Sequence, residues 1–415
     1  MHVVIVAHAR HPLAEPFAGG LESLTAHLIR GLAARGHRVS VFAARGTEEV
    51  PGVEYLWPQT LELSAAAQAD VSMPEAGWMQ QHHAHLDLMM QLAQRTDVDI
   101  VHTHALHYLP VAMAPLLPAP TVLSLHTPPT PWLESSLRAA QGIPGRQPVV
   151  TAVSRHTARA WADLVRAQVV PNGIDTREWR PGPGGPALVW SGRITPEKAP
   201  HLAVAIARRA GMPLVLAGPV SDEAYARDVL WPLLREGITY AGHLRTSELA
   251  ALVGRSAAAL VTPDWDEPFG LVAAEALACG TPVLALDRGG LGEVVGEQGG
   301  RLVPVHDRAG RQLTDSEVVR RGSELLPEVL QLSRPLARAH AVRHLSVDTM
   351  VDHFERVYGS TVRLGRRSSL RHARGPARVA ARAGRTARAA AGELAAHPRT
   401  VGSLALSETE AEPSR

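Results

Sequence analysis

A regular alternation of short apolar runs with helix-like patterns is the feature that most limits the fold of this 415-residue chain. It begins with the apolar run HVVIVA, continues into the amphipathic pattern GLESLTAHLIRGLAARG at 20–36, and returns to an apolar run in RVSVFA. Such alternation is typical of βαβ units, whose strands form a parallel sheet. The first part of the chain therefore predicts one doubly wound domain, with strands at 2–7, 38–43, 99–104, 121–126 and 148–154.

A stretch dense in proline and glycine, PNGIDTREWRPGPGGPA, interrupts this pattern and predicts an interdomain linker. A second series of apolar runs follows, and the chain is longer than one hydrophobic core usually organises. We therefore expect an α/β protein with two Rossmann-like domains, at 1–170 and 187–345, joined by a linker at 171–186. The strands expected in the second domain are 187–192, 213–218, 238–243, 258–263, 282–286 and 300–304.

The basic charge of the chain is concentrated at its end. Residues 361–415 hold 11 arginines and four glutamates, a net charge of +7, which leaves −5 on residues 1–360. The main body thus lacks the general basic character of a nucleic-acid-binding protein. The tail is rich in Arg and Ala and poor in large apolar side chains, so we expect it to be disordered or loosely helical. A basic helix in weak contact with an anionic membrane is the alternative interpretation.

The cysteine usage and the N-terminal residues bear on the compartment. Cys279 is the single cysteine, and its apolar context EALACG favours a buried, inert thiol. MHVVIVAHARHP lacks the basic segment and the longer apolar run of a signal peptide, and we expect no transmembrane span. These features predict a cytoplasmic protein, peripheral to a membrane only if its tail binds lipid.

Two loops that follow predicted strands carry groups suited to phosphate. Gly19 and Gly20 precede a helix, where paired glycines let backbone amides approach a phosphate or sugar, although an unliganded turn would look the same. In SGRITPEKAP, Arg193 and Lys198 can neutralise the phosphate of a departing nucleoside diphosphate, and a surface pair beside Glu197 is the alternative. Lys198 is the single lysine in a chain with 41 arginines.

The stretch DWDEPFGLVAAEALACGTPVLA is the most specific in the chain. Glu267 precedes a turn at Phe269 and Gly270, a helix is expected to begin near Leu271, and Glu275 lies in its second turn. Exposed amides and the positive helix end would thus stand between two carboxylates. One carboxylate can hold sugar hydroxyls and the other a ribose, while the helix end meets a phosphate. Either glutamate could instead be a structural residue.

Histidines gather in the first predicted domain. His126, at the end of a predicted strand, could contact a sugar or the developing charge near the anomeric carbon, or it could be structural. A zinc enzyme is an alternative, but no H-E-x-x-H or CxxC pattern accompanies these residues, and we expect no bound metal. The histidines concerned are those at 82, 83, 85, 102, 104, 107 and 126.

Five segments, in order and spacing, resemble the retaining glycosyltransferases of family four. They are the Gly19-Gly20-x-Glu22 turn, VVPNGID, SGRITPEK, EPFGLVAAEALACGTPV and GGLGEVV. The resemblance covers roughly residues 1–358. The Glu-x7-Glu pattern together with the Arg and Lys pair is specific to that family, whereas the glycine turn and the Asn-Gly segment are supporting features.

The resemblance implies the GT-B fold, in which two Rossmann-like domains face each other across a cleft. A last helix, here 346–360, would cross back onto the first domain. By position, Arg193 and Lys198 would bind the donor diphosphate, Glu267 the donor-sugar hydroxyls and Glu275 the ribose. Gly19, Gly20, Phe269, Gly270 and Leu271 would line the same donor site, and His126 would match a sugar-contacting histidine.

The resemblance also implies transfer with retention of the anomeric configuration. A same-face displacement fits, in which the leaving phosphate, stabilised by the two cations and the helix amides, itself takes the acceptor proton. The donor is expected to be a nucleotide-diphosphate sugar, UDP-glucose or a related UDP-hexose, with no cofactor, and the acceptor a small molecule, lipid or glycan. A GDP-mannose-dependent mannosyltransferase and a non-catalytic sugar-nucleotide-binding partner protein are the alternatives. A pyridoxal-phosphate phosphorylase would need Lys198 as its anchor, in the place expected for diphosphate.

Overall fold

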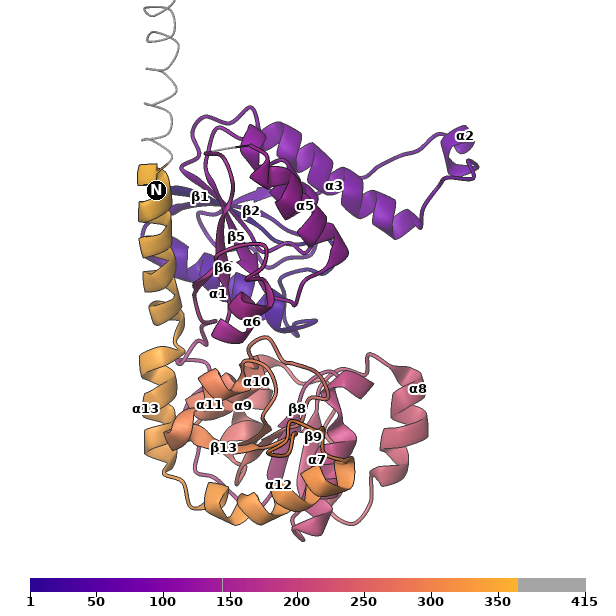
Figure 1. Cartoon of the computed structure of the whole chain (residues 1–415), viewed down its shortest axis with the longest axis vertical. Helices are drawn as coiled ribbons and strands as arrows, with labels where there is room; N and C mark the ends of the chain where they lie inside the picture. Colours follow the sequence, from indigo (N-terminus) through magenta and orange to yellow (C-terminus); the bar gives the residue numbers. More distant parts are fainter. Residues whose placement is uncertain (144, 365–415) are drawn as a thin grey trace, which may run out of the picture. The chain divides into compact units, whose positions relative to one another are not determined.

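The computed structural model describes residues 1–143 and 145–364 of the chain, and these contain two parallel β-sheets (Figure 1). The predicted fold class, two Rossmann-like α/β domains, is confirmed, and each strand predicted from the sequence is present. The first sheet has the order β3-β2-β1-β4-β5-β6-β7 and the second the order β10-β9-β8-β11-β12-β13. Each order reverses beside the first strand of its sheet, and ligands of such sheets bind at this reversal, beyond the carboxyl ends of the strands.

The strands of the first sheet are β1 (His2–Val6), β2 (Arg38–Phe42), β3 (Glu54–Leu56), β4 (Ile100–Thr103), β5 (Thr121–Leu125), β6 (Val149–Ala152) and β7 (Gln168–Val169). Those of the second are β8 (Leu188–Ser191), β9 (Leu214–Ala217), β10 (Ile238–Tyr240), β11 (Ala259–Val261), β12 (Val283–Leu286) and β13 (Gly300–Val303). The sequence did not predict β3 and β7, the two edge strands of the first sheet. Both are too short and too exposed to leave a periodic apolar pattern.

Helices cover both sheets. Those of the first domain are α1 (Gly20–Ala34), α2 (Ala65–Gln68), α3 (Ala76–Leu92), α4 (Leu109–Ala112), α5 (Pro131–Gln141) and α6 (Arg155–Ala160). Those of the second are α7 (Pro200–Arg209), α8 (Glu223–Tyr225), α9 (Thr246–Gly254), α10 (Leu271–Ala278), α11 (Leu291–Gly299), α12 (Asp315–Leu330) and α13 (Arg334–His344). Short 3-10 or π turns occur at η1 (Ala114–Leu116), η2 (Pro196–Lys198), η3 (Ala226–Leu230) and η4 (Trp231–Leu233).

The last helix, residues 347–364, follows α13 and returns to the first domain (yellow in Figure 1). Its Val351, Phe354 and Tyr358 belong to the same hydrophobic core as β1 and α1, whereas α13 packs into the core of the second domain. The helix that the family resemblance implied at 346–360 is therefore present, and it continues to residue 364 within the described part of the chain. The Arg-rich segment expected to be disordered or membrane-bound lies outside the described residues from residue 365 onward.

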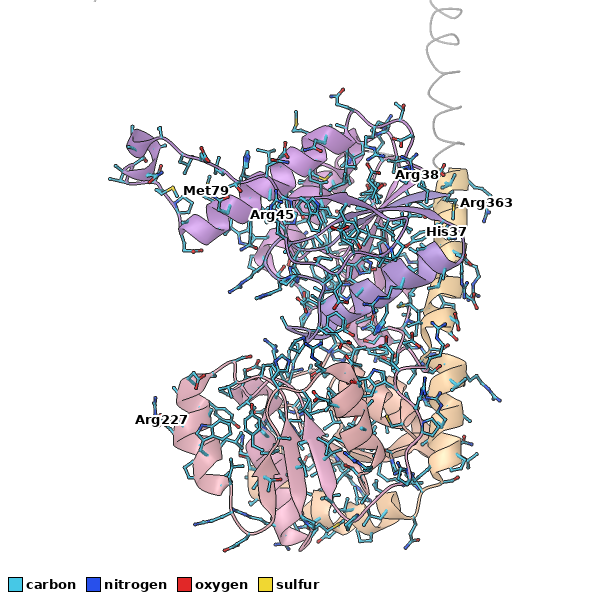
Figure 2. The ribbon with its side chains drawn as sticks, turned by 180° about the vertical axis from the view of Figure 1, so that it is seen from behind. His37, Arg38, Arg45, Met79, Arg227 and Arg363 are labelled. Carbon is cyan, nitrogen blue, oxygen red and sulfur yellow. The ribbon has the colours of Figure 1, made fainter. Side chains whose placement is uncertain are left out.

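Close contact with α1 holds this last helix in place. Gly31 has no side chain where α1 meets it, and a Cβ there would lie 2.8 Å from Cγ2 of Val351. At the end of α1, Arg35 donates to Glu355. The imidazole of His37, which Figure 2 labels, lies 2.8 Å from the same carboxylate. Small and charged side chains thus fix a helix distant in sequence onto the first domain.

The two places where the chain passes between the domains are hydrogen-bonded side by side. The Ile174 amide donates to the Leu345 carbonyl at 2.7 Å, and the Val347 amide donates to the Ile174 carbonyl at 3.1 Å. Gly173 is needed there, because a Cβ would lie 2.7 Å from the Cα of Val347. Within the described residues, none of the helices combines the length and apolar character needed to cross a bilayer.

Candidate active site

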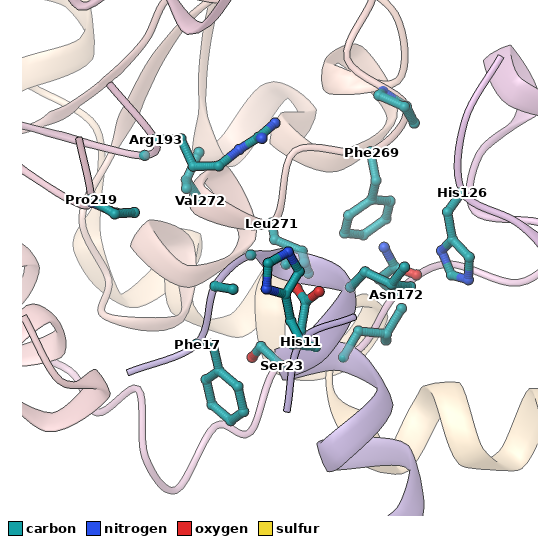
Figure 3. A pocket seen from close by; sticks show the side chains of 18 of the residues that line it. His11, Phe17, Ser23, His126, Asn172, Arg193, Pro219, Phe269, Leu271 and Val272 are labelled. Carbon is teal, nitrogen blue, oxygen red and sulfur yellow. The ribbon is translucent and has the colours of Figure 1, made fainter. Parts of the chain in front are cut away.

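A cavity of about 770 Å³ lies where loops of the two domains meet (Figure 3). It is lined from the first domain by the loop after β1 and the start of α1, and from the second by the loops that follow β8, β9 and β11. This is the position that the strand order indicates for a ligand. All ten residues predicted from the sequence line it: Gly19, Gly20, His126, Arg193, Lys198, Glu267, Phe269, Gly270, Leu271 and Glu275.

The glycine turn brings the first domain close to the second. Gly19 is the extended N-cap of α1, and Gly20 is the first residue of that helix. A Cβ on Gly20 would lie 2.5 Å from Cδ1 of Leu271, so a side chain would press against the second domain. Beside this turn, Glu22 accepts a hydrogen bond from His8 and is 6% exposed. Burial acts to raise the pKa of Glu22. The hydrogen bond from His8 and the charge interaction with His8 outweigh burial, so this pKa lies below its ordinary value.

The two predicted cations stand at the carboxyl end of β8. Lys198 lies at the end of η2, and its Nζ is 2.5 Å from Oε2 of Glu267. The indole of Trp265 donates to the same carboxylate oxygen at 3.1 Å, and its ring centroid lies 5.1 Å from the Lys198 ammonium. Arg193 is about half exposed and contacts Glu197 at 3.5 Å. Lys198 and Glu267 thus form one neutral pair on the cavity wall, with Arg193 more open to a ligand.

The turn between Glu267 and α10 presents backbone amides to the cavity. Gly270 has a φ of +96° and caps α10 without a side-chain hydrogen bond, so the first amides of the helix keep their donors for a ligand. Leu271 and Val272, the first residues of α10, line the cavity. The turn is held from behind, because the Glu267 carbonyl accepts a hydrogen bond from the Gly290 amide at 2.7 Å.

Glu275 projects from the second turn of α10 into the cavity lining. Burial raises the pKa of its carboxyl to about 7, because a charge is costly where water is largely excluded. The group can therefore donate a hydrogen bond when protonated and accept two or more when ionised. A pair of ligand hydroxyls suits either state.

His126 follows β5 and contacts a second histidine. Its Nε2 lies 3.0 Å from Nδ1 of the buried His104. Burial lowers the pKa of His126 to about 4, so the imidazole is neutral at neutral pH. It can orient a hydroxyl, but it cannot supply a positive charge to the cavity at that pH.

Comparison with known proteins identifies the family. A family model described as Glycosyltransferase Family 4 matches residues 18–178, and one described as Glycosyl transferases group 1 matches residues 175–313. A D-inositol 3-phosphate glycosyltransferase of Rhodococcus erythropolis is 30% identical over 357 residues, covering 72% of this chain and 78% of that protein. The chain belongs to glycosyltransferase family 4.

Solved structures share the fold of this glycosyltransferase. A sucrose-phosphate synthase from Thermosynechococcus elongatus superposes with a TM-score of 0.67 at 18% identity, covering 87% of this chain and 99% of its own. HepE of Anabaena, solved in complex with UDP-glucose, gives a TM-score of 0.62 at 17% identity, covering 87% and 100%. The predicted GT-B fold is thereby confirmed.

His102, one of the histidines that raised the zinc alternative, bonds to two hydroxyls in this glycosyltransferase. His102 places Nδ1 2.6 Å from the hydroxyl of Tyr358 and Nε2 2.8 Å from the hydroxyl of Ser124. These bonds tie β4 to the last helix and to β5. Among residues 1–143 and 145–364, no three His, Cys, Asp or Glu side chains are grouped as metal ligands would be.

A direct polar clamp connects the two domains of the glycosyltransferase beside the cavity. The carboxylate of Glu293 accepts hydrogen bonds from the Arg155 and His156 amides, both at 2.9 Å, at the start of α6. Thr157 donates to the Pro268 carbonyl at 3.3 Å. The GGLGEVV segment, which the sequence offered as a family motif, therefore also contacts the first domain.

Sequence reasoning missed the aromatic part of the cavity lining. Trp78, Tyr108 and Trp132 line it from the first domain, and Trp265 lines it from the second. Trp265 lies within the DWDEPFG stretch, where sequence reasoning considered only the glutamates and the turn. Trp78 and Trp132 sit on different helices 54 positions apart in the numbering. His85 and His107 also line the cavity, although the sequence raised them only as zinc ligands.

Proposed function

We propose that this family 4 glycosyltransferase transfers a hexose from UDP-glucose, or a related UDP-hexose, to a hydroxyl of its acceptor with retention of configuration. The observation that carries the proposal is the joint position of Arg193, Lys198 and the open N-terminus of α10 on one cavity. These groups supply positive charge and backbone donors where a diphosphate leaving group would develop negative charge. No metal ion is needed for that role, and metal independence is part of the proposal.

The carboxylates of the cavity support the assignment of a sugar nucleotide. Glu267, oriented by Lys198 and Trp265, is suited to accept hydrogen bonds from donor-sugar hydroxyls. Glu275, deeper along α10, is suited to the two hydroxyls of a ribose. Gly19 and Gly20 bring backbone amides close from the opposite domain, and His126 offers a neutral imidazole to the sugar.

The charge state of these groups supports retention without a covalent enzyme intermediate. Glu267 is ion-paired with Lys198, and the raised pKa of Glu275 lowers the fraction of the carboxylate that could act as a nucleophile. We infer a same-face displacement in which the bond from the anomeric carbon to the phosphate oxygen breaks as the acceptor oxygen approaches. The departing phosphate takes the acceptor proton, and Arg193, Lys198 and the helix amides stabilise its charge.

The donor is tested by thermal-shift measurements on the full chain with UDP-glucose, GDP-mannose and ADP-glucose, each with and without excess EDTA. The proposal predicts the largest stabilisation by UDP-glucose, unchanged by EDTA. A larger shift with GDP-mannose would reassign the donor, and loss of turnover in EDTA would overturn metal independence.

Stereochemistry is tested by NMR of the anomeric proton in the first product formed. Retention predicts the same anomeric configuration in the product as in the donor. An inverted product would overturn the mechanism. Binding of UDP-glucose with neither transfer nor donor hydrolysis would make the chain a sugar-nucleotide-binding partner protein instead.

A further inference from the structure

Part of the first-domain wall of the cavity is a group of neighbouring rings, which we call the aromatic shelf: Trp78, His85, His107, Tyr108 and Trp132. Arg10 and Glu22 line the same domain's wall elsewhere, in the loop after β1 and at the start of α1. Four of these rings are stacked, and Trp78 is tilted by 46° against Trp132 with the two centroids 6.4 Å apart. The centroids of His85 and His107 are 4.4 Å apart at 4°, those of His107 and Tyr108 are 4.8 Å apart at 23°, and those of Tyr108 and Trp132 are 5.3 Å apart at 26°. Trp132, the outermost ring, is 58% exposed.

The shelf carries no charge at neutral pH. Its two titratable imidazoles are neutral, because burial lowers the pKa of His85 to about 4 and that of His107 to about 3. Gln81 and Leu106, which also line this end, are uncharged. A phosphorylated or carboxylated ligand would find no cationic side chain among the shelf residues to offset its desolvation.

The backbone partners of the two histidines fix their tautomers. Nδ1 of His85 lies 2.8 Å from the Gln81 carbonyl, which can only accept, so this nitrogen carries the proton and Nε2 is an acceptor. Nδ1 of His107 accepts from the Leu109 amide at 3.3 Å, so the proton of this neutral ring is on Nε2, which is a donor. Both Nε2 atoms are buried without a hydrogen-bond partner among the described residues.

Two stacked rings therefore offer one unused acceptor and one unused donor. Leaving either buried atom unpaired costs free energy, which a ligand group recovers if it reaches that atom. A hydroxyl can donate to His85 and accept from His107, whereas a phosphate or carboxylate oxygen cannot donate to His85. The aromatic faces beside them carry partial negative charge and attract the slightly positive C–H bonds of a pyranose face.

We propose that the aromatic shelf is the acceptor subsite and that the acceptor is an uncharged carbohydrate, with a pyranose ring on Trp132 and a hydroxyl reaching His85 and His107. This inference rests on the proposed transfer from a nucleotide sugar, and it adds the chemical class of the acceptor. The opposite end of the cavity, with Arg193 and Lys198, remains for the donor.

The acceptor class is tested with the full chain, UDP-glucose, and a panel of matched acceptors. Maltose, cellobiose and lactose represent neutral carbohydrates, and glucose 6-phosphate and myo-inositol 3-phosphate represent charged ones. Mass spectrometry of the products should show transfer to at least one neutral disaccharide and slower transfer to the phosphorylated compounds. Transfer confined to a phosphorylated acceptor would overturn the inference.

Variants then locate the subsite. Trp132→Ala should raise the acceptor KM about tenfold and leave the Kd for UDP unchanged, because it removes a stacking face and no donor contact. His107→Phe keeps the stacked ring but deletes the Nε2 donor, and it should raise the same KM several-fold. Leu116→Ala, which removes an exposed apolar side chain outside the cavity lining, is the control and should change neither constant.

The two levels of the proposal fail in different ways. An unchanged acceptor KM in both Trp132→Ala and His107→Phe would overturn the shelf as the acceptor subsite while the donor assignment stands. A wild-type chain that neither binds UDP-glucose nor hydrolyses it would instead overturn the proposed function. His85 is avoided as a target, because it is fully buried and its loss could unfold the domain.

Discussion

The two ends of the cavity present chemically different groups. The second-domain end holds an ion pair, an exposed arginine and a helix N-terminus, so its groups suit a charged ligand. The first-domain end holds stacked neutral rings with one unused hydrogen-bond donor and one unused acceptor. On our proposals, this difference in charge between the second-domain groups and the aromatic shelf would let one cavity separate a charged donor from a neutral acceptor.

The largest expected effect comes from removing the single lysine, which should disable the donor end and leave the shelf intact. Lys198→Ala should lower kcat by about 100-fold or more, because one cation that stabilises a leaving phosphate is lost and Glu267 is left unpaired. The acceptor KM should stay within about twofold of wild type. Steady-state kinetics with both substrates varied separates the two constants.

Arg227→Ala is the matched control for Lys198→Ala. Arg227 is an exposed cation that pairs with Asp228 and lies on the outside of the second domain (Figure 2). Near-normal turnover in Lys198→Ala, or an equal loss in both variants, would contradict the assigned role.

A smaller effect is expected from the backbone that shapes the donor end. Gly289 has a φ of +64°, and a Cβ there would lie 2.2 Å from the carbonyl oxygen of Glu267. Gly289→Ala should therefore lower the free energy of unfolding and weaken UDP binding together. Gly36→Ala supplies the control, because Gly36 also has a positive φ, but a Cβ there would meet no atom within 4 Å.

Denaturant unfolding and UDP titration measure both effects. We expect the loss of stability in Gly289→Ala to exceed that in Gly36→Ala by about 2 kcal/mol, since only the former adds a clash with backbone to the strain. Equal losses in the two variants would show that this clash does not shape the turn.

The contact between the two ends is tested at Glu293. Glu293→Ala removes the acceptor for two amides at the start of α6 and should cost about 1–2 kcal/mol of stability. It should also raise KM for donor and acceptor alike, because the clamp holds both domains. Glu297→Ala, an exposed change on the same helix, should do neither. A change in only one of the two KM values would tie Glu293 to one end of the cavity.

The last effect is a pH dependence of stability from Glu275, whose carboxyl stays protonated at pH values above its ordinary pKa. Because burial raises this pKa to about 7 from 4.5, the folded state holds a proton that the unfolded chain has lost. Its contribution therefore lowers the stability of the folded state as pH rises from about 4.5 to about 7. Glu275→Gln removes that decline.

Thermal unfolding at pH 5, 6, 7 and 8 without ligand measures the decline at Glu275. Relative to wild type, Glu275→Gln should gain about 2 kcal/mol between pH 5 and pH 8. Glu297→Gln controls for the loss of one carboxylate at an exposed position. Parallel pH profiles for wild type and Glu275→Gln would show that Glu275 titrates as an ordinary glutamate.

The sequence by itself determined the fold class, because buried parallel strands are continuous apolar runs and the helices between them have their own period. It also singled out Arg193 and Lys198 by their place after a predicted strand, and it singled out Glu267 and Glu275 mainly through the family resemblance. What it did not determine was which of them pair. Lys198 and Glu267 are 69 positions apart, and their ion pair exists only because β8 and β11 are neighbours in the sheet.

The aromatic shelf was decided by the tertiary structure alone. Trp78, Tyr108 and Trp132 come from α3, the loop before α4, and α5, and each looks like an ordinary residue in its own segment. The same holds for the tautomers of His85 and His107, which depend on the carbonyl or amide that each ring meets. Residues that belong to a short motif can be found from the sequence around them. Ring stacking and hydrogen-bond partners depend on distances between segments, and only the packed chain sets these distances.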